Sequence, residues 1–284
     1  MLTLGNEILI INELDSGATS TVYLVKSIKN EEIFAAKVYN EPSKSYLNEI
    51  EILKRLSSLN CPNIIKLISY GEDYIIINGI PEKEKKQYIL LDYLPNKDLY
   101  FYISNLKEKN ESNIKTLFYK IVKAVEQCHN NGVCHRDLKL DNIMLDKNNE
   151  PVLCDFGVAG LIENNSGKLT EFVGTKMYMA PEILRNKPYS GIKCDIFSLG
   201  VILFTLMFHK FGFEKASTTD KYYKLIRKKK FNQYWEEIGL IIGKEKVNNI
   251  SKEFKELYFK MVAYSPDDRP SINEILNNNW LTDT

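Results

Sequence analysis

The sequence predicts an α+β protein built of two unequal lobes, and three observations support this prediction. The first ninety residues read as β-strands, whereas most of the chain after Pro95 has the apolar spacing of helices. Runs of strands followed by runs of helices are typical of α+β folds. The chain has 284 residues, of which 44% are hydrophobic, so it can bury a substantial core in one large domain or two small ones packed as a unit.

The smaller lobe is expected to hold an antiparallel meander of strands. The candidate segments are rich in Ile, Val, Thr and Tyr and are separated by turn signals such as Asp-Ser-Gly and Lys-Asn-Glu. A charged segment, residues 82–86, is expected to form the exposed tip of the last hairpin. The predicted strands are Glu7 to Leu14, Thr21 to Ile28, Glu32 to Tyr39, Ile64 to Ile80 and Tyr88 to Tyr93.

One helix is expected to interrupt these strands, from Ser45 to Leu59. Its apolar residues recur at helical spacing, from Tyr46 to Leu56. Glu49 lies one turn before Leu53, at the edge of the apolar stripe, and is therefore predicted to face inward.

The larger lobe is expected to be mainly helical. Its most apolar stretch, Ile196 to Phe208, has about 13 residues where a membrane span needs about 20, so it predicts a buried core helix and no membrane partner. The predicted helices are Asn113 to His129, Lys193 to Phe208, Asp220 to Lys229, Lys252 to Ala263 and Ser271 to Trp280.

Charge and cysteine content argue against several classes of function. The formal net charge is +1, and the one basic run, Arg227 to Lys230, is interpreted as a solvated helix face, so no nucleic-acid partner is expected. The five cysteines and three histidines show no metal-finger or zinc-hydrolase spacing. We find no leader sequence and expect a reduced intracellular protein, cytoplasmic or nuclear, that is monomeric.

The residues that indicate chemistry lie in the middle of the chain. His135-Arg136-Asp137 is followed by Lys139 and Asn142, and the strand-like segments 143–145 and 152–154 flank a polar turn. Such a hairpin brings Asn142 at its entrance beside Asp155 at its exit. Two oxygen ligands at this place suit a hard cation such as Mg²⁺, which also binds waters and phosphate oxygens.

Each of these pieces is unremarkable alone, because a buried His is usually core and an Asp before Gly is usually a turn residue. Together with Asp155-Phe156-Gly157, Gly174-Thr175 and Ala180-Pro181-Glu182 in fixed order, they resemble the eukaryotic protein kinases. The resemblance extends from about Ile8 to Trp280. It implies one bilobal catalytic domain over residues 1–284, with a small lobe at 1–91, a hinge at 92–95 and a large lobe at 96–284.

The resemblance implies transfer of the γ-phosphoryl group of ATP to protein hydroxyls. Asp137 would orient the hydroxyl and accept its proton, and Lys139 would neutralise the transferring phosphoryl group. Asn142 and Asp155 would hold Mg²⁺, while Thr175 would brace the catalytic loop. Lys139 and the sequence from Gly174 to Tyr178 resemble the serine/threonine type rather than the tyrosine type.

The upstream residues agree with this interpretation. Strand alternation puts Ala35 and Lys37 on one face, so that Ala35 leaves room for a flat base while Lys37 reaches phosphates. Glu49 is the expected ion-pair partner of Lys37. By resemblance, the residues expected to bind the nucleotide are Leu14, Gly17, Val22, Ala35, Lys37, Leu91, Asp92, Leu94, Asp98 and Met144.

The glycine-rich loop departs from the kinase pattern, since only the middle glycine, Gly17, is kept. Asp15 and Ser20 stand where the family has glycine, and a turn that needs positive φ is harder at these residues. An acidic side chain near a triphosphate is also electrostatically unfavourable. We therefore expect weakened nucleotide affinity. A pseudokinase that serves as a binding or scaffolding module is the alternative, and a small-molecule kinase is a third possibility.

Further positions match the family by resemblance. Asp195 is expected to anchor the catalytic loop, and Glu182 is expected to form a buried ion pair with Arg269. Leu140 in Asp-Leu-Lys-Leu-Asp-Asn is similar to the calmodulin-dependent and AMP-activated-like branch. The substrate preference is expected to be mildly basic because of Asp98 and Asp141, with Thr205 in place of a further acid.

Regulation is expected to involve Arg136, which precedes the catalytic aspartate. The position three residues before Gly174, where many kinases carry a phosphorylated threonine, holds Glu171, and its neighbour is Thr170. Either Glu171 supplies a constitutive negative charge to Arg136, or Thr170 is phosphorylated in a shifted register. Cys154, immediately before Asp155, is expected to line the ATP pocket and to be alkylated by ATP-competitive electrophiles.

Overall fold

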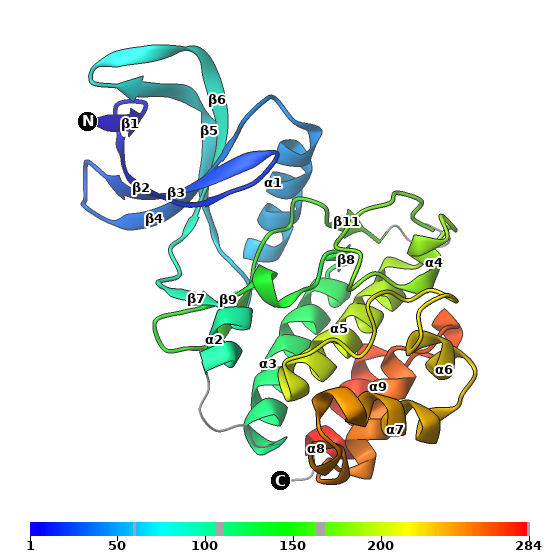
Figure 1. The fold of residues 1–284 in the computed structure, drawn as a ribbon. Helices are drawn as coiled ribbons and strands as arrows, with labels where there is room; N and C mark the ends of the chain where they lie inside the picture. Colours follow the sequence, from blue (N-terminus) through cyan, green and yellow to red (C-terminus); the bar gives the residue numbers. More distant parts are fainter. Residues whose placement is uncertain (59–60, 106–110, 163–167, 283–284) are drawn as a thin grey trace.

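The computed structural model describes residues 1–58, 61–105, 111–162 and 168–282, and it has the predicted α+β fold with two unequal lobes (Figure 1). The smaller lobe consists of strands and one helix, α1. The larger lobe is mainly helical and carries short strands at its junction with the smaller lobe. The interlobe junction is where the predicted catalytic residues lie.

The strands of the smaller lobe close into a six-stranded antiparallel barrel in the order β1-β2-β3-β4-β6-β5. Alternation along the strands fills the barrel with apolar side chains, including Ile10, Val25, Ala36, Val38 and Leu90. The strands are β1 (Leu2–Leu4), β2 (Ile8–Ser16), β3 (Ser20–Ser27), β4 (Ile33–Tyr39), β5 (Leu67–Ile77) and β6 (Ile80–Asp92).

The predicted position of the tip of the last hairpin was wrong. Residues 82–86 lie within β6, and the turn is made by Asn78 and Gly79, which have φ of 50° and 85°. A two-residue turn with positive φ at both positions favours Asn-Gly, because its twist matches that of the strands. The short strand β1 was not predicted; it pairs with both β2 and β5 and closes the barrel.

Helix α1 (Lys44–Ser57) confirms the predicted helix of the smaller lobe, although Leu59, its predicted end, lies outside the described residues. Ser43 caps its first turn, since its hydroxyl accepts a hydrogen bond from the Ser45 N–H. The buried face of α1 includes Glu49, as expected, together with Ile50 and Leu53. These apolar residues belong to the same core cluster as the large lobe, so α1 packs across the junction.

The larger lobe is organised around α5, which is almost completely buried. By length and composition, α5 alone among the helices of the described residues could cross a membrane, but 83% of its apolar window is buried inside the protein, as expected of a core helix. The longer helices are α3 (Glu111–Asn130), α5 (Gly191–Phe208), α7 (Phe231–Ile242) and α9 (Lys252–Met261). The shorter ones are α2 (Leu99–Asn105), α4 (Pro181–Leu184), α6 (Tyr223–Arg227), α8 (Lys244–Asn248), α10 (Ile272–Leu276), α11 (Asn279–Thr282), η1 (Leu140–Asn142) and η2 (Pro266–Asp268).

Several helices differ from their predicted bounds. The predicted helix 271–280 is two short helices, α10 and α11, and the predicted helix 220–229 shortens to α6. Helix α7 was not predicted. Two small sheets complete the lobe next to the junction: β7 (Asn96–Asp98), β9 (Ile143–Leu145) and β10 (Pro151–Leu153) form one, and β8 (Val133–Cys134) and β11 (Gly160–Leu161) form the other.

Candidate active site

The catalytic loop begins after β8 and is fixed by a buried carboxylate from α5. Asp195, 1% exposed, accepts hydrogen bonds from the main-chain N–H groups of His135 and Arg136, both at 2.8 Å. Arg136 has φ of 66°, a left-handed conformation that is rare outside glycine. The two hydrogen bonds to Asp195 stabilise this turn, in agreement with the expected anchoring role.

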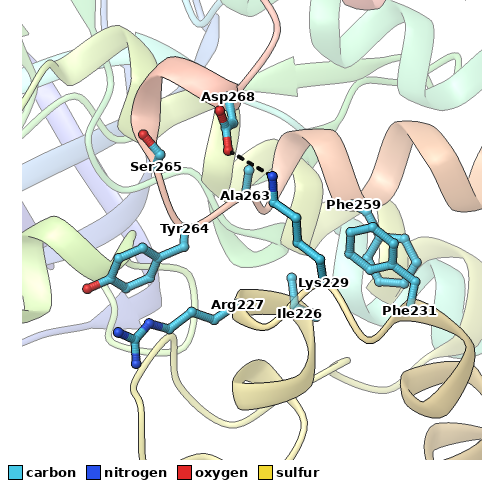
Figure 2. A pocket seen from close by; sticks show the side chains of 9 residues that line it. All are labelled: Ile226, Arg227, Lys229, Phe231, Phe259, Ala263, Tyr264, Ser265 and Asp268. Carbon is cyan, nitrogen blue, oxygen red and sulfur yellow. Dashed lines mark ion pairs between the residues drawn. The ribbon is translucent and has the colours of Figure 1, made fainter.

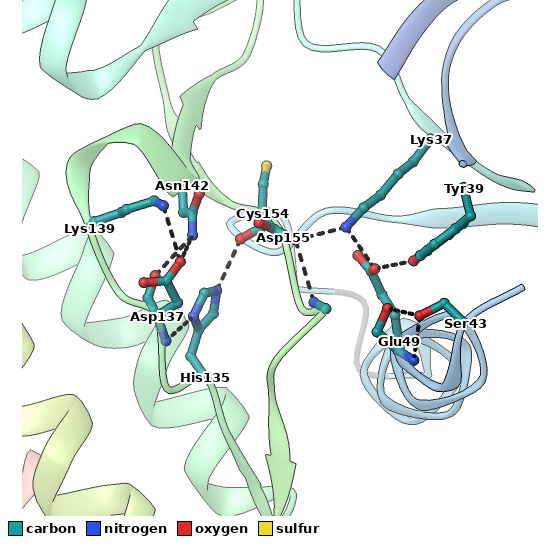
Figure 3. A network of polar contacts seen from close by, with 12 residues as sticks. Lys37, Tyr39, Ser43, Glu49, His135, Asp137, Lys139, Asn142, Cys154 and Asp155 are labelled. Atoms are coloured by element: carbon teal, nitrogen blue, oxygen red, sulfur yellow. Dashed lines mark hydrogen bonds and ion pairs between the residues drawn. The ribbon is translucent and has the colours of Figure 1, made fainter. Parts of the chain in front are cut away.

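Of the two carboxylate oxygens of Asp137, one has polar partners among the described residues and the other has no hydrogen-bond partner there. Its Oδ2 accepts from Asn142 Nδ2 at 3.1 Å and lies 3.1 Å from the Lys139 ammonium (Figure 3). Its Oδ1 is buried and has no hydrogen-bond partner among the described residues. Because a buried carboxylate oxygen without a donor is energetically costly, this atom is a strong candidate to accept a hydrogen bond from a ligand.

The residues of the Gly174-Thr175 motif pack on the catalytic loop. Thr175 Oγ1 accepts a hydrogen bond from Lys139 Nζ at 3.2 Å, which is the bracing contact expected for this residue. Gly174 has φ of 103°, and a Cβ at this position would lie 2.5 Å from the Arg136 carbonyl oxygen. Only glycine fits here, since both the conformation and the close approach exclude a side chain.

The predicted hairpin places Asn142 and Asp155 next to each other. Strands β9 and β10 pair with Ile143 opposite Leu153, and the Cys154 N–H donates to the Asn142 carbonyl at 2.9 Å. Asp155 follows directly, with φ of 60° and a side chain that is 48% exposed. The amide oxygen of Asn142 and the carboxylate of Asp155 are the type of donors that Mg²⁺ prefers, so these residues fit the ion that the kinase resemblance implies.

Lys37 links the two lobes through two carboxylates. Its Nζ lies 2.7 Å from Glu49 Oε2 on α1 and 2.8 Å from Asp155 Oδ1 (Figure 3). Burial alone would lower the pKa of Lys37, but Glu49 and Asp155 together raise the pKa above its usual value. Burial would likewise raise the pKa of Asp155, yet Lys37 holds that pKa below the ordinary range. Both groups are therefore charged at neutral pH.

Three polar side chains of the candidate site were not predicted from the sequence. The Tyr39 hydroxyl donates to Glu49 Oε2 at 2.5 Å, and Asn48 Nδ2 donates to the Ala159 carbonyl at 2.9 Å. His129 Nε2 lies 2.9 Å from Asp195 Oδ2. Tyr39 could have been found, because it follows Lys37 by two residues and strand alternation places both on one face. No comparable local signal identifies Asn48 or His129.

Apolar side chains from both lobes pack together at the junction. Leu53, His135 and Phe156 are buried, and Leu67 packs against the same core. The rings of His135 and Phe156 have centroids 4.9 Å apart and are tilted by 57°. This packing keeps Phe156 inside the core and leaves the adjacent Asp155 next to Lys37.

Most of the residues expected to bind the nucleotide lie on β-strands of the two lobes. Val22 pairs across the sheet with Lys37, Ala35 pairs with Leu91, and Met144 pairs with Val152. The Asp92 N–H donates to the Lys66 carbonyl, so its main-chain carbonyl is the group of this residue that could serve adenine. Burial raises the pKa of the Asp92 carboxyl, and Lys66 partly opposes this effect. Leu14 is exposed, and Leu94 packs against the core.

The glycine-rich loop does not have the strain expected from its sequence. Asp15 and Ser20 lie in β2 and β3, and neither has a φ in the left-handed region. The Gly17 N–H donates to the Ser20 carbonyl at 2.9 Å and closes the turn. The expectation that these two positions require positive φ was therefore wrong, because the hairpin turns without it.

The three residues expected to influence the substrate preference, Asp98, Asp141 and Thr205, differ in their exposure and hydrogen bonding. Asp98 Oδ1 accepts from the Phe101 N–H at 2.8 Å and thereby caps α2, while Asp141 is exposed. Thr205 is 1% exposed, and its hydroxyl donates to the Val201 carbonyl within α5. Thr205 thus presents no surface to a peptide.

The segment that carries Thr170 and Glu171, called here the activation segment, is tied to the catalytic loop by Arg136. Its guanidinium donates to the carbonyls of Val158 and Ala159 and, at 3.1 Å, to Glu171 Oε2. The pKa of Glu171 is lowered by main-chain N–H donors, including its own and that of Thr170, and by Arg136, although burial opposes this. The segment is also held by two main-chain hydrogen bonds, which Leu169 and Tyr189 donate to each other, each at 2.9 Å.

The structural ion pair of the larger lobe has the expected geometry. The guanidinium of Arg269 donates to both carboxylate oxygens of Glu182 at 2.7 Å, and Arg269 is buried.

A separate cavity of about 200 Å³ lies between α6, α9 and η2 (Figure 2). At this cavity Phe231 stacks on Phe259, and Lys229 lies 3.8 Å from Asp268. Its lining includes none of the predicted catalytic residues.

Comparison with known proteins agrees with this geometry. Residues 9–281 match the protein kinase domain, so the chain belongs to the protein kinase family. It is 32% identical to mouse sperm motility kinase 2B over 84% of this chain and 43% of that protein. It is also 32% identical to the human NUAK family SNF1-like kinase 1, over 92% of this chain and 34% of the relative.

A plant relative extends the comparison. The chain is 28% identical to the CBL-interacting serine/threonine-protein kinase 20 of Arabidopsis thaliana, over 94% of this chain and 57% of that protein. These relatives confirm the predicted placement in the serine/threonine kinase superfamily, near its AMP-activated-like branch. The chain spans between a third and three fifths of the length of the relatives named here.

Proposed function

We propose that this chain is an active serine/threonine protein kinase domain that transfers the γ-phosphoryl group of ATP to Ser or Thr hydroxyls of protein substrates. The observation that best supports activity is the unpartnered, buried Oδ1 of Asp137. Lys139 and Asn142 occupy the other oxygen, so Oδ1 is free to orient a substrate hydroxyl and to accept its proton.

The remaining groups support transfer by position and charge. Lys37, held by Glu49, would bind the α and β phosphates, and Lys139 would neutralise charge on the transferring group. Asn142 and Asp155 would hold Mg²⁺, which neutralises the phosphates when bound. Thr175 fixes Lys139, so the ammonium is positioned before the substrate arrives.

The geometry of the glycine-rich loop weighs against the pseudokinase alternative. Asp15 and Ser20 were its only sequence support, and both adopt ordinary strand conformations. Asp15 Oδ1 also accepts a hydrogen bond from the Ser16 N–H at 2.9 Å, so this oxygen already has a local partner. A small-molecule kinase is disfavoured by the Ala180-Pro181-Glu182 region, which in the family shapes a peptide-docking lobe.

The regulation that we propose uses Glu171 as a constitutive charge. Glu171 is already paired with Arg136, and Tyr189 donates from its hydroxyl to the Glu171 carbonyl at 2.9 Å. The segment is therefore held without a phosphate on Thr170.

We further propose a single catalytic domain with the hinge at residues 92–95 and a mild substrate preference for basic residues near Asp98 and Asp141. The domain would be monomeric and would reside in the cytoplasm or nucleus.

The test is transfer of radiolabelled γ-phosphate from MgATP to an arrayed Ser/Thr peptide library. The native chain is compared with Asp137→Asn, and a panel of small hydroxylated metabolites is run in parallel. Peptide transfer that disappears in Asp137→Asn supports the proposal and reports the sequence preference. Equal signal from both proteins, or transfer to the small molecules alone, would refute it.

A further inference from the structure

We propose that Tyr39 is a positioning residue for phosphoryl transfer, whose hydroxyl holds the Glu49 carboxylate in the orientation in which it binds Lys37. The inference rests on the proposed kinase function and adds a third residue to the Lys37–Glu49 pair. Figure 3 shows the Glu49 carboxylate between the tips of the Lys37 and Tyr39 side chains.

The position of Tyr39 follows from the alternation of β4. Ala36 and Val38 face the interior of the barrel, whereas Tyr39 belongs to the core cluster that contains α1. Lys37 and Tyr39 therefore share the face that looks toward α1. Both reach the same atom: Glu49 Oε2 lies 2.7 Å from Lys37 Nζ and 2.5 Å from the Tyr39 hydroxyl.

Burial makes this second donor important. Glu49 and Tyr39 are each 1% exposed, so water cannot replace a missing donor without rearrangement. A buried carboxylate that loses a hydrogen bond becomes less favourable in its original place and can rotate toward another donor. The Tyr39 hydroxyl carries no charge. It can therefore orient the Glu49 carboxylate without itself attracting the phosphates that Lys37 would bind.

The ring of Tyr39 is itself fixed. It packs edge-on against Tyr46 of α1, with ring centroids 5.3 Å apart and planes at 75°. The Tyr46 hydroxyl donates in turn to the Gly71 carbonyl of β5 at 3.1 Å. Tyr39 thus joins β4 to α1 at the level of Glu49, while Tyr46 joins α1 to β5 in the preceding turn.

A purely structural role for Tyr39 is the competing explanation, because buried tyrosine hydroxyls usually find some acceptor. The two roles are separated by Tyr39→Phe, which keeps the ring and removes only the donor. Tyr46→Phe is the matched control, since it removes a neighbouring hydroxyl that does not contact Glu49. Glu49→Gln and the double variant with Tyr39→Phe complete a cycle that isolates the coupling between the two residues.

The experiment measures kcat and KM for MgATP, the Kd for MgADP by calorimetry, and the Tm of every variant. We expect Tyr39→Phe to lower kcat/KM by about tenfold, the loss typical of a hydrogen bond to a charged group. We expect it to weaken MgADP binding severalfold. Tyr46→Phe should change each of these quantities less than about twofold, and Tyr39→Phe should add less than about twofold in the Glu49→Gln background.

Three results would overturn the inference: native-like rate and MgADP affinity in Tyr39→Phe, an equal loss in Tyr46→Phe, or a full Tyr39→Phe effect in Glu49→Gln. The failure of the proposed function is distinguishable. A native chain that binds MgADP but transfers no phosphate refutes the kinase activity, and Tyr39 is then judged by MgADP affinity across the same variants. A native chain that neither binds MgADP nor transfers phosphate refutes both.

Discussion

In the larger lobe, the catalytic loop is fixed through its main chain, because Asp195 of the core helix α5 binds the N–H groups of His135 and Arg136. In the smaller lobe, Lys37 is held through side chains, by Glu49 on α1 and by Asp155. The first arrangement persists as long as α5 is folded. The second depends on the placement of a helix that packs across the junction. We therefore expect substitutions at the buried contacts of the larger lobe to affect stability or chemistry abruptly, and those around Lys37 in the smaller lobe to have graded effects on nucleotide binding.

The largest effect on stability is expected in the buried ion pair of the larger lobe. Glu182→Ala leaves the Arg269 guanidinium buried without its carboxylate, which costs ~3–5 kcal/mol. The Tm measured by calorimetry should fall by roughly 10 °C. Glu49→Ala is the matched variant in the smaller lobe, where Lys37 keeps Asp155 as a partner, and it should lose less than about half as much. Equal losses would remove the distinction between the lobes.

The two motif glycines should respond differently to an added methyl group. In Gly174→Ala the new Cβ would meet the Arg136 carbonyl at 2.5 Å in a left-handed backbone, which costs ~1–3 kcal/mol and should reduce phosphoryl transfer at least tenfold. In Gly17→Ala the nearest atom is 3.6 Å away, so the Tm should stay within about 1 °C of the native value. A folded Gly174→Ala with native kcat would contradict the packing described for this loop.

This contrast also explains how much could be predicted from sequence. The α+β fold and the residues around Asp137 follow motifs with fixed spacing, and inward-facing Glu49 follows helical periodicity. The tip at Asn78-Gly79 was missed although its signal is local, because the charged residues 82–86 were given more weight. Strand β1 and the Asn48–Ala159 contact depend on distant pairings, which a single sequence does not encode locally.

A smaller effect is expected in the activation segment. Glu171→Gln removes the charge paired with Arg136, but the Glu171 side chain is 59% exposed and such pairs contribute ~0–1 kcal/mol, so kcat should fall about twofold to fivefold. Thr170→Ala should leave kcat unchanged within error. Mass spectrometry of the active protein provides the check. Phosphate on Thr170 together with an inactive Thr170→Ala would favour the shifted-register alternative.

The smallest expected effect is on the alkylation of Cys154, which immediately precedes Asp155. Burial raises the pKa of its thiol to about 12, so thiolate is scarce at neutral pH and alkylation should be slow. The rate should rise about tenfold per pH unit between pH 7 and pH 9, because thiolate increases in that proportion. Saturating MgATP should slow labelling, as followed by peptide mass spectrometry. Fast, pH-independent labelling, or labelling that MgATP leaves unaffected, would argue against this position of Cys154.

In the proposed kinase, Asp137 of the larger lobe acts on the substrate hydroxyl, and Lys37 of the smaller lobe binds the nucleotide phosphates. The most direct measurement compares phosphoryl transfer with MgADP affinity in Asp137→Asn and Lys37→Met. We expect Asp137→Asn to lower transfer at least about a hundredfold while the Kd for MgADP stays within about twofold. Lys37→Met should instead weaken MgADP binding. An Asp137→Asn protein that keeps transferring phosphate, or that loses MgADP affinity as strongly as Lys37→Met, would contradict this division of roles between the two lobes.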